Sequence, residues 1–512
     1  MLDRLSRLRF ASVACALACV SPLYAGDSLT VYGTSTAGTG GIAPRLWANQ
    51  TPLPGAPGFA FEIDRGLGGA PAVVFLAAAR GSVTLAGLDL NLDLATLLPV
   101  GAVVLTGSGA GAGSGSVPAP LPNLPNLVGV TLPTQALVFD AGSSSALGLS
   151  GSRGLELKLA LPGLLIVPRS VGGTADPQHA MDLASGQLVE FSSGRVNNGE
   201  AAVFTNDGSE FVIPAALSGS VVSYDARTFP PKYTKSASIP SQNGHPWSAA
   251  MHPDGLRLYV VNQGTATTAC TVECLWAQPR AANYLTPFPG GNVTLPNISD
   301  ALDMRFSFDG NQGFLSVLGL VSGGARLLRI DTNRSSTTYH QITGQLQWPG
   351  KFVFAMAIAP NRLRAYVTIA SLGGNSEIAV VDLVRFVVLD QDPGTPGIQN
   401  LGGEMSFART ALEKQITQMT CGPRGDFLYT ANYSTISKID IDPASPTYRK
   451  VTTTNAGMTA AAFSYSVVLT DAGDRMFVGT HTDSNVLEFD PKTMALVKST
   501  KVGNNITQLG IR

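Results

Sequence analysis

Histidine, the side chain that most often acts as a general base or a metal ligand, is scarce in this sequence. The chain of 512 residues has five histidines, at positions 179, 245, 252, 340 and 481. No two are spaced as ligands on one strand, so we expect no cofactor; a divalent metal gathered from several repeats is the alternative. His245 and Trp247 lie on a loop before a predicted strand, and together with His481 they are candidate ligand-binding residues.

The cysteines suggest a disulfide. Cys15 and Cys19 fall within an N-terminal targeting segment, which leaves three in the mature chain. Cys270 and Cys274 are four residues apart in a loop-like stretch, which favours a local disulfide in an oxidising compartment. A metal pair is the alternative, but no His or Cys lies nearby in the sequence to complete a tetrahedral site. Cys421 lies in an apolar strand pattern and is predicted to be a buried free thiol.

No motif for nucleophilic catalysis is present. The sequence lacks a Gly-x-Ser-x-Gly elbow in a strand–turn–helix setting, and Ser143–Ser145 has the composition of a loop. Five aspartates recur at the same place in successive repeats: Asp225, Asp331, Asp382, Asp440 and Asp490. Such recurrence is typical of structural turn residues, so we interpret these carboxylates as structural and predict no catalytic residue.

Two insertions between predicted strands are the other places where function is expected, because loops on a rigid scaffold carry recognition. The first spans about residues 263–300 and carries Trp276 and Arg280. The second spans about 387–416 and carries Asp390 and Asp392, which lack the spaced ligand pattern of a calcium loop. We include these four residues among the candidate ligand-binding residues, although the insertions are equally well explained as decoration.

The elements that must position these residues form an internal repeat. From about residue 200 onward, a unit of apolar strand, tight turn, second strand and third strand ending near an Asp recurs six times. The turns lie near residues 207, 254, 309, 361, 424 and 472, at spacings of 47, 55, 52, 63 and 48 residues. A four-stranded propeller blade takes roughly 40–50 residues, so the repeat predicts a β-propeller with loop insertions.

The two ends of the repeat region predict a seventh blade. Residues 505–512 match the first strand of a further unit, and three strand-like runs lie between 163 and 191. One C-terminal strand and three N-terminal strands make one blade, which closes the ring and removes two exposed edges. We therefore predict an all-β fold with a seven-bladed β-propeller over residues 161–512, with six or eight blades as alternatives.

Two units carry a recognisable local sequence. Pro253-Asp254-Gly255 followed by Leu258-Tyr259-Val260-Val261-Asn262 resembles the YVTN-type β-propeller repeat, and Gly425 to Asn432 is similar. The resemblance covers about residues 200–512, and other units depart from it; Asn361-Arg362, for example, stands in place of Asp-Gly. Such repeats occur in surface proteins, lactonase-like hydrolases and assembly proteins, so the resemblance implies a WD40-like scaffold and leaves its function open.

The N-terminal part of the chain has a different character. Residues 1–25 have a basic start and a short apolar run, Phe10 to Val20, which predict a signal peptide and a secreted, periplasmic or cell-surface protein. Residues 26–160 are rich in Gly, Ala, Leu and Pro and predict a smaller β-sandwich accessory domain, in which Gly107 to Gly115 forms a loop. No later stretch is long and apolar enough to span a membrane once the signal is removed.

Composition narrows the function classes. The formal net charge is −1, and only 13% of residues are charged, which gives no electrostatic footprint for nucleic acid. The first hypothesis is a secreted binding protein that presents a protein, glycan or small-molecule site on the propeller, without catalysis. The alternative is a lactonase-like hydrolase with a metal at the propeller axis. A quinone-cofactor dehydrogenase is weaker, because only four Trp are present.

Overall fold

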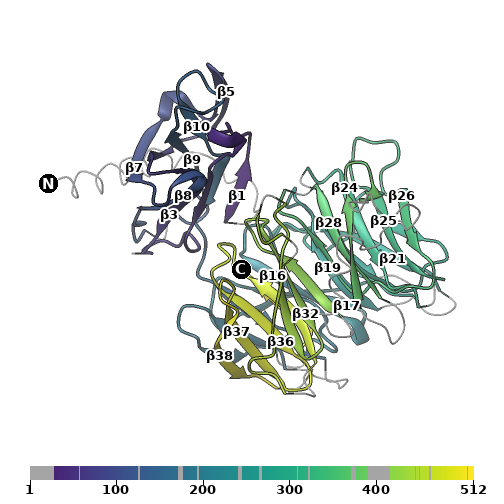
Figure 1. The fold of residues 1–512 in the computed structure, drawn as a ribbon. Coiled ribbons are helices and arrows are strands. Elements are labelled where there is room, and N and C mark those ends of the chain that lie inside the picture. Colours follow the sequence, from purple (N-terminus) through teal and green to yellow (C-terminus); the bar gives the residue numbers. More distant parts are fainter. Residues whose placement is uncertain are drawn as a thin grey trace. The chain divides into compact units, whose positions relative to one another are not determined.

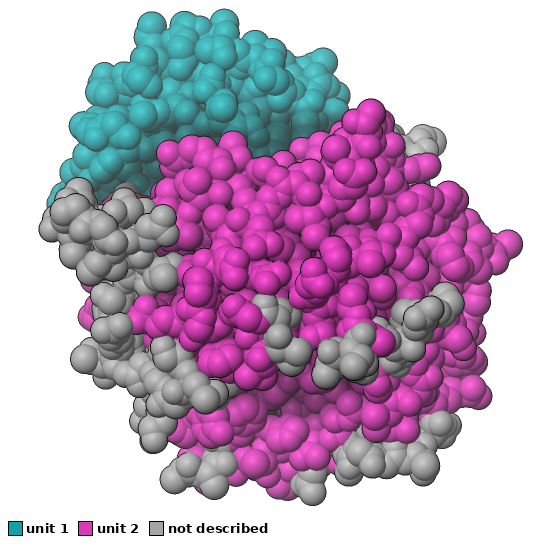
Figure 2. Space-filling model, turned by 90° about the vertical axis from the view of Figure 1, so that its right-hand side faces the viewer, with its two compact units in different colours: residues 1–162 teal, residues 163–512 magenta. Residues whose placement is uncertain are grey.

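The structure is a computed structural model of the whole chain, in which the strands dominate. It describes residues 28–512 apart from these: 57, 125–126, 171–176, 193–194, 240–244, 265–267, 308, 321–322, 362, 371–375, 390–415, 444, 449, 460–462 and 504. The chain divides into two compact units, Met1–Pro162 and Gly163–Arg512 (Figure 2). The predicted signal peptide lies outside the described residues. No helix among the residues described meets the length and apolarity that a membrane span requires.

The described part of unit 1 contains three sheets. The largest has the order β1 (Leu29–Tyr32), β11 (Gly154–Lys158), β9 (Thr131–Phe139), β4 (Pro71–Leu76) and β7 (Leu98–Val104), with β10 (Leu149–Gly151) paired to β9. The second has the order β2 (Arg45–Ala48), β3 (Ala60–Gly68) and β8 (Gly109–Pro118), and the third pairs β5 (Arg80–Leu85) with β6 (Leu88–Leu92). Short 3-10 helices span Thr39–Gly41 and Leu94–Thr96. The β-sandwich architecture of this unit stays a prediction.

The Gly/Ala/Ser-rich run of unit 1 was predicted to be a loop, and this is wrong. It forms the strand β8, which pairs with β3 in the register Ile63 to Gly115. Its glycines let the backbone of β3 approach closely, since a Cβ at Gly113 would lie 2.7 Å from the carbonyl oxygen of Leu67. Composition alone therefore gives the wrong element, because the small side chains here allow strands to pack closely and do not mark a flexible loop.

Seven four-stranded sheets follow in the described part of unit 2 (Figure 1). Six use consecutive strands: β15 (Val203–Phe204), β16 (Glu210–Ala215), β17 (Ser220–Asp225) and β18 (Lys232–Ser238); β19 (Pro246–Met251), β20 (Arg257–Asn262), β21 (Cys270–Trp276) and β22 (Val293–Leu295); β23 (Ala301–Phe306), β24 (Gln312–Val317), β25 (Ala325–Asp331) and β26 (Ile342–Trp348); β27 (Met356–Ile358), β28 (Arg364–Ala370), β29 (Ser376–Asp382) and β30 (Val387–Val388); β31 (Ile416–Cys421), β32 (Phe427–Asn432), β33 (Thr435–Asp440) and β34 (Val451–Thr454); β35 (Ser464–Leu469), β36 (Met476–Thr480), β37 (Asn485–Asp490) and β38 (Ala495–Lys501). A 3-10 helix spans Ala216–Ser218.

The remaining sheet joins the two ends of unit 2. Its order is β14 (Leu188–Glu190), β13 (His179–Asp182), β12 (Leu164–Val167) and β39 (Gly510–Ile511). The C-terminal strand pairs antiparallel with β12, with Ile511 opposite Leu165. The guanidinium of Arg512 then donates to the carbonyl oxygens of Gly208 and Ala226, so the end of the chain is bound to the sheet of β15–β18.

Hydrophobic clusters connect the sheets in a closed cycle. One cluster, with Ile166 and Phe211, joins the sheet of β12–β14 to that of β15–β18. Five further clusters join each sheet to the next in chain order. A last cluster, with Val167 and Phe477, joins the sheet of β35–β38 back to β12–β13. Sheets that each pack on two neighbours around a ring form a β-propeller, so the predicted all-β propeller fold is confirmed.

The first strand of each sheet lies at the middle of the ring, and in the closing sheet β39 takes this place. These strands contact one another between neighbouring sheets: β15 with β19, β19 with β23, β27 with β31, β31 with β35, and both β35 and β15 with β39. We call the end of the sheets where these strands begin the proximal end. The end with the first hairpin turns is the distal end. Loops that precede first strands or follow second strands are therefore proximal, and first turns are distal.

Candidate functional site

Among the described strands, four innermost ones carry an extra residue near the proximal end: β19, β23, β31 and β35. Each has a register shift against its neighbouring strand shortly after the strand begins. In β19, β31 and β35 the extra residue is the second of the strand, which is Trp247, Thr417 and Tyr465 respectively. A bulge re-aims a side chain without disturbing the rest of the ladder, and bulges are frequent beside functional sites. The proximal ends of these strands are thus built to present particular side chains.

Tyr465 is the bulge residue that lies among other chemically active groups. Its ring centroid is 5.8 Å from that of His481, which follows the second strand of the same sheet. Burial raises the pKa of the Tyr465 phenol, and the nearby Glu200 carboxylate raises the pKa further. The phenol therefore stays protonated at neutral pH and can donate a hydrogen bond.

His481 is held by the backbone of the C-terminal segment. Its Nδ1 lies 3.2 Å from the carbonyl oxygen of Ile506, and its own carbonyl accepts a 3.0 Å bond from the Asn505 amide. A carbonyl oxygen can only accept, so this contact assigns a proton to Nδ1, and Nε2 is the ring nitrogen left to act as a base. This is the arrangement that orients a histidine as a base.

Glu200 lies on the segment leading into β15 and is buried. Its Oε1 accepts a 2.5 Å bond from Asn198 Nδ2, and its backbone oxygen accepts from the amide of Gln508. The buried Arg169 lies in the same part of the proximal end, where its guanidinium packs against Gly503. We call Glu200, Tyr465 and His481, with Arg169, the proximal group.

Aromatic side chains flank the proximal group. Phe463 is 5.7 Å from Tyr465 and 6.0 Å from His481 between ring centroids. Tyr433, from the neighbouring sheet, meets Phe463 edge to face at 4.5 Å and is 45% exposed. The proximal group is therefore bordered by an apolar, partly exposed rim on one side.

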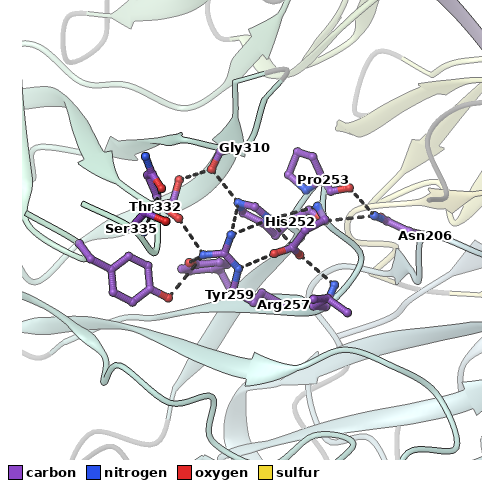
Figure 3. Close-up of polar contacts among 12 residues, drawn as sticks. Asn206, His252, Pro253, Arg257, Tyr259, Gly310, Thr332 and Ser335 are labelled. Carbon is purple, nitrogen blue, oxygen red and sulfur yellow. Dashed lines mark hydrogen bonds and ion pairs between the residues drawn. The ribbon is translucent and has the colours of Figure 1, made fainter. Parts of the chain in front are cut away.

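A second collection of polar groups lies at the distal end and is shown in Figure 3. Arg257, at the start of β20, is 4% exposed; its Nε donates to Asp254 Oδ2 at 2.7 Å. Its Nη1 donates to the Thr332 carbonyl at 2.8 Å and to the Tyr259 hydroxyl at 3.1 Å. Tyr259 in turn lies 3.0 Å from Nε2 of His340, whose pKa burial lowers to about 4.

The first hairpin turns of three sheets meet in this distal network. His252 Nε2 lies 2.7 Å from the carbonyl oxygen of Gly310, in the first turn of the next sheet. Asn206, in the first turn of the preceding sheet, donates to the carbonyls of His252 and Pro253 at 3.1 and 3.2 Å (Figure 3). A cluster this buried, in which most polar groups already have protein partners, has little access to substrate, and we interpret it as a connection between sheets.

The structure divides the predicted ligand-binding residues between the two ends of the ring. His245 is exposed and Trp247 half-buried, and both are proximal, as is His481. Trp276 ends β21 at the distal end and packs on Phe288 with ring centroids 4.3 Å apart. Arg280 is exposed in the distal connection that follows, with a positive φ of 65°. The remaining two, Asp390 and Asp392, lie outside the described residues. The five described residues thus lie at two different ends of the ring, and the ligand-binding role of the set stays a prediction.

The predicted disulfide is wrong. Cys270 and Cys274 are separate thiols at opposite ends of β21, opposite Leu295 and Tyr259 respectively. Four residues of extended strand span roughly 13 Å, whereas a disulfide requires Cα atoms within about 7 Å. The stretch has a loop-like composition, but it forms a strand that is buried over most of its length. Cys421, also a free thiol, is half-buried.

The sequence interpretation missed Glu200 and Tyr465. A signal for Tyr465 was present, because Tyr465-Ser466 and Trp247-Ser248 occupy the same place in their repeats. The residues that recur in every repeat are the apolar ones that follow, so the aromatic-Ser pair lies just outside the recurring unit. Nothing local marks Glu200, which meets Tyr465 only when the ring closes.

The residues described do not fit an axial metal. Nowhere in the described part of the chain do three His, Cys, Asp or Glu side chains gather in a way that could hold an ion. The proximal group contains one imidazole and one carboxylate, with a phenol and a guanidinium that are poor ligands. We therefore derive no step through a metal.

Comparisons with known proteins support the fold. No model of a known protein family and no curated protein matches the sequence. Among solved structures, the chain is similar to a functionally unknown protein from Desulfotomaculum acetoxidans, with 14% identity, a TM-score of 0.51 and coverage of 68% of this chain and 98% of that one. It is also similar to a putative 6-phosphogluconolactonase from Bacteroides uniformis, with 15% identity, a TM-score of 0.50 and coverage of 68% and 99%.

A third structure, the periplasmic gluconolactonase PpgL of Pseudomonas aeruginosa, is 16% identical over 68% of this chain and 98% of that one, with a TM-score of 0.49. At identities this low the likeness concerns the fold alone. The likeness to the first two structures agrees with the ring of four-stranded sheets in unit 2, while membership of the YVTN-type repeat class stays a prediction.

Proposed function

We propose that this chain is a lactonase-like hydrolase, built on a complete seven-bladed propeller, that opens a sugar lactone at the proximal group. The observation that carries the proposal is the orientation of His481, whose Nδ1 is held by the Ile506 carbonyl beside the Tyr465 phenol and the Glu200 carboxylate. The fold shared with the Bacteroides uniformis protein supports it. Of the two hypotheses drawn from the sequence, this proposal is the lactonase-like hydrolase, but without a metal at the propeller axis.

The proposed reaction assigns a step to each side chain. Nε2 of His481 takes a proton from a water molecule while the oxygen of that water attacks the carbonyl carbon of the lactone. The Tyr465 hydroxyl and the Arg169 guanidinium stabilise the negative oxygen of the tetrahedral intermediate. The ring C–O bond then breaks, and the departing alkoxide takes the proton from His481, which gives a hydroxy acid. Burial, and to a smaller extent the Glu200 carboxylate, raise the pKa of the Tyr465 phenol and so disfavour its loss of a proton during the reaction.

Secretion belongs to the same proposal. A lactonase with the predicted signal peptide would act in the periplasm, outside the cell or at its surface. Mass spectrometry of protein from the native host should give a mature chain that begins after Ala25. A chain that retains residues 1–25 would contradict this part.

The experiment is a pH-stat assay of δ-gluconolactone hydrolysis by the full mature chain, corrected for the spontaneous rate. We expect turnover that survives EDTA. His481→Asn should lower kcat/KM by roughly 10²- to 10⁴-fold, and Tyr465→Phe and Glu200→Gln by smaller factors. Tyr233→Phe is the matched control, because Tyr233 is 41% exposed on an outer strand. Loss of turnover in EDTA, or an unimpaired His481→Asn, would overturn the mechanism.

A secreted binding protein is the second candidate, and the rim of Tyr433 and Phe463 favours it. Exposed aromatic rings beside polar groups are typical of ligand-binding surfaces. The same assay separates the two candidates. A wild-type protein that does not hydrolyse the lactone, yet binds it with an affinity that Tyr433→Ala weakens, would exclude the hydrolase and leave the binding function.

A further inference from the structure

The sheet of β23–β26 has a recess at its distal end that belongs neither to the proximal group nor to the distal network. Its volume is about 300 Å³, at the small end of the range of roughly 300–1,000 Å³ that is usual for ligand pockets. The lining side chains are polar and comprise one cation, one carboxylate, amides and hydroxyls: Arg329, Asp331, Asn311, Gln312, Asn333 and Ser336.

The cation of the recess, Arg329, makes no ion pair with the described residues. Arg329 Nη2 donates one long bond of 3.3 Å to the Thr343 carbonyl, and its buried Nε has no acceptor. The guanidinium instead stacks over the ring of Phe386, 4.9 Å from its centroid. Gly344 makes room for this stack, since a Cβ there would lie 2.9 Å from the ring. Arg329 is therefore held in place without being neutralised.

The carboxylate of the recess, in contrast to Arg329, has hydrogen-bond partners on both oxygens. Asp331 Oδ1 accepts a 2.9 Å bond from the Asn333 amide, and Oδ2 accepts a 2.5 Å bond from the Thr338 hydroxyl. The charge of Asp331 is thus stabilised by its own loop, and Arg329 is not needed as its partner. Each carboxylate oxygen retains further lone-pair capacity and can still accept from a ligand hydroxyl.

These groups select one ligand chemistry. Every lining residue carries a polar group, so an apolar ligand would leave these groups without partners, and a cation would be repelled by Arg329. A bare inorganic anion would use Arg329 but would meet Asp331. We infer that the recess binds a polyhydroxylated carboxylate, a uronate or an aldonate, with its carboxylate on Arg329 and its hydroxyls on Asp331 and the neighbouring amides. This site is separate from the proximal group and does not rest on the proposed hydrolysis.

Ligand-observed NMR and calorimetry on the full mature chain test the inference with four probes. Glucuronate and gluconate present the complete chemistry as a ring and as an open chain, glucose lacks the carboxylate, and acetate lacks the hydroxyls. We expect glucuronate or gluconate to bind at least about tenfold more tightly than glucose and acetate, since a charge-assisted pair and several hydroxyl bonds act together.

The variants assign the binding to the recess. Arg329→Gln should remove the preference for the carboxylate, and Asp331→Asn should weaken binding of both sugar acids. Arg227→Gln is the matched control, because Arg227 is bound to Asp225 and lies on a different sheet. No binding by the wild type, equal binding of glucose or acetate, or a carboxylate preference that persists in Arg329→Gln would each overturn the inference. Lactone hydrolysis should be unchanged in Arg329→Gln, so the two proposals fail separately.

Discussion

The distal network makes a quantitative prediction for Arg257. Arg257→Met removes the guanidinium from Asp254 and leaves the Thr332 carbonyl without its 2.8 Å donor. Breaking a buried ion pair from one side costs ~3–5 kcal/mol. The Asp254 side chain keeps 24% exposure and a bond from the Leu256 amide, so we expect the lower end, about 3 kcal/mol.

Urea unfolding followed by tryptophan fluorescence measures this cost, since three of the four tryptophans lie in unit 2. The midpoint should fall at an unchanged slope. Arg385→Met is the matched control. Arg385 pairs with Asp382 at the same three-residue spacing and at 2.8 Å, but its side chain is 68% exposed. Exposed pairs contribute only ~0–1 kcal/mol. Equal midpoint shifts in the two variants would refute the view that burial makes Arg257 important.

Three further predictions concern the same region. The free energy of unfolding should fall in two steps on acidification. Burial lowers the pKa of His340 to about 4, so the folded state holds the ring neutral and stability falls between pH 6.5 and 4, where only the unfolded chain takes up the proton. The pKa of Asp254 is lowered to about 2, so its contribution to stability is lost below pH 3.8. His340→Gln should remove only the upper step in a urea titration against pH. Gly310→Ala should lower stability by more than about 1 kcal/mol in that assay, because its φ of 70° is strained for Ala and its Cβ would lie 2.5 Å from the His252 ring. The Cys274 thiol, whose pKa burial raises to about 12, should resist a thiol reagent in the native protein and react in urea.

The propeller could be predicted because its physical causes are local and repeated. Each unit places apolar strands around a tight turn, and glycines such as Gly255 and Gly310 adopt the positive φ that the turn requires. Asp225, Asp382 and Asp490 each accept a hydrogen bond from the backbone amide two residues further on, in keeping with the structural interpretation of these recurring aspartates. Unit 1 has no repeat that could show which glycine-rich stretches are turns and which are strands. The composition of β8 therefore predicts a loop, because a run of glycines is typical of turns.

The proximal group could not be predicted from local pattern. Glu200 precedes β15, whereas Tyr465 and His481 belong to the last full repeat, so the three meet only through the closing sheet. The carbonyl that orients His481 comes from Ile506, which is 25 residues further along the chain. Recurrence in the sequence marks residues that every sheet needs. A site that occurs once in the ring depends on residues that break the recurrence.

The two ends of the ring differ in how their polar groups are satisfied, and this difference indicates where chemistry can take place. At the distal end, Arg257 and His252 have protein partners and little exposure, so a substrate would have to displace a stabilising bond to reach them. At the proximal end, His481 uses one ring nitrogen to hold its orientation, and a bulge presents Tyr465 beside it. Substitutions in the distal network should therefore change stability before they change turnover, whereas His481→Asn should change turnover while the unfolding midpoint stays close to that of the wild type.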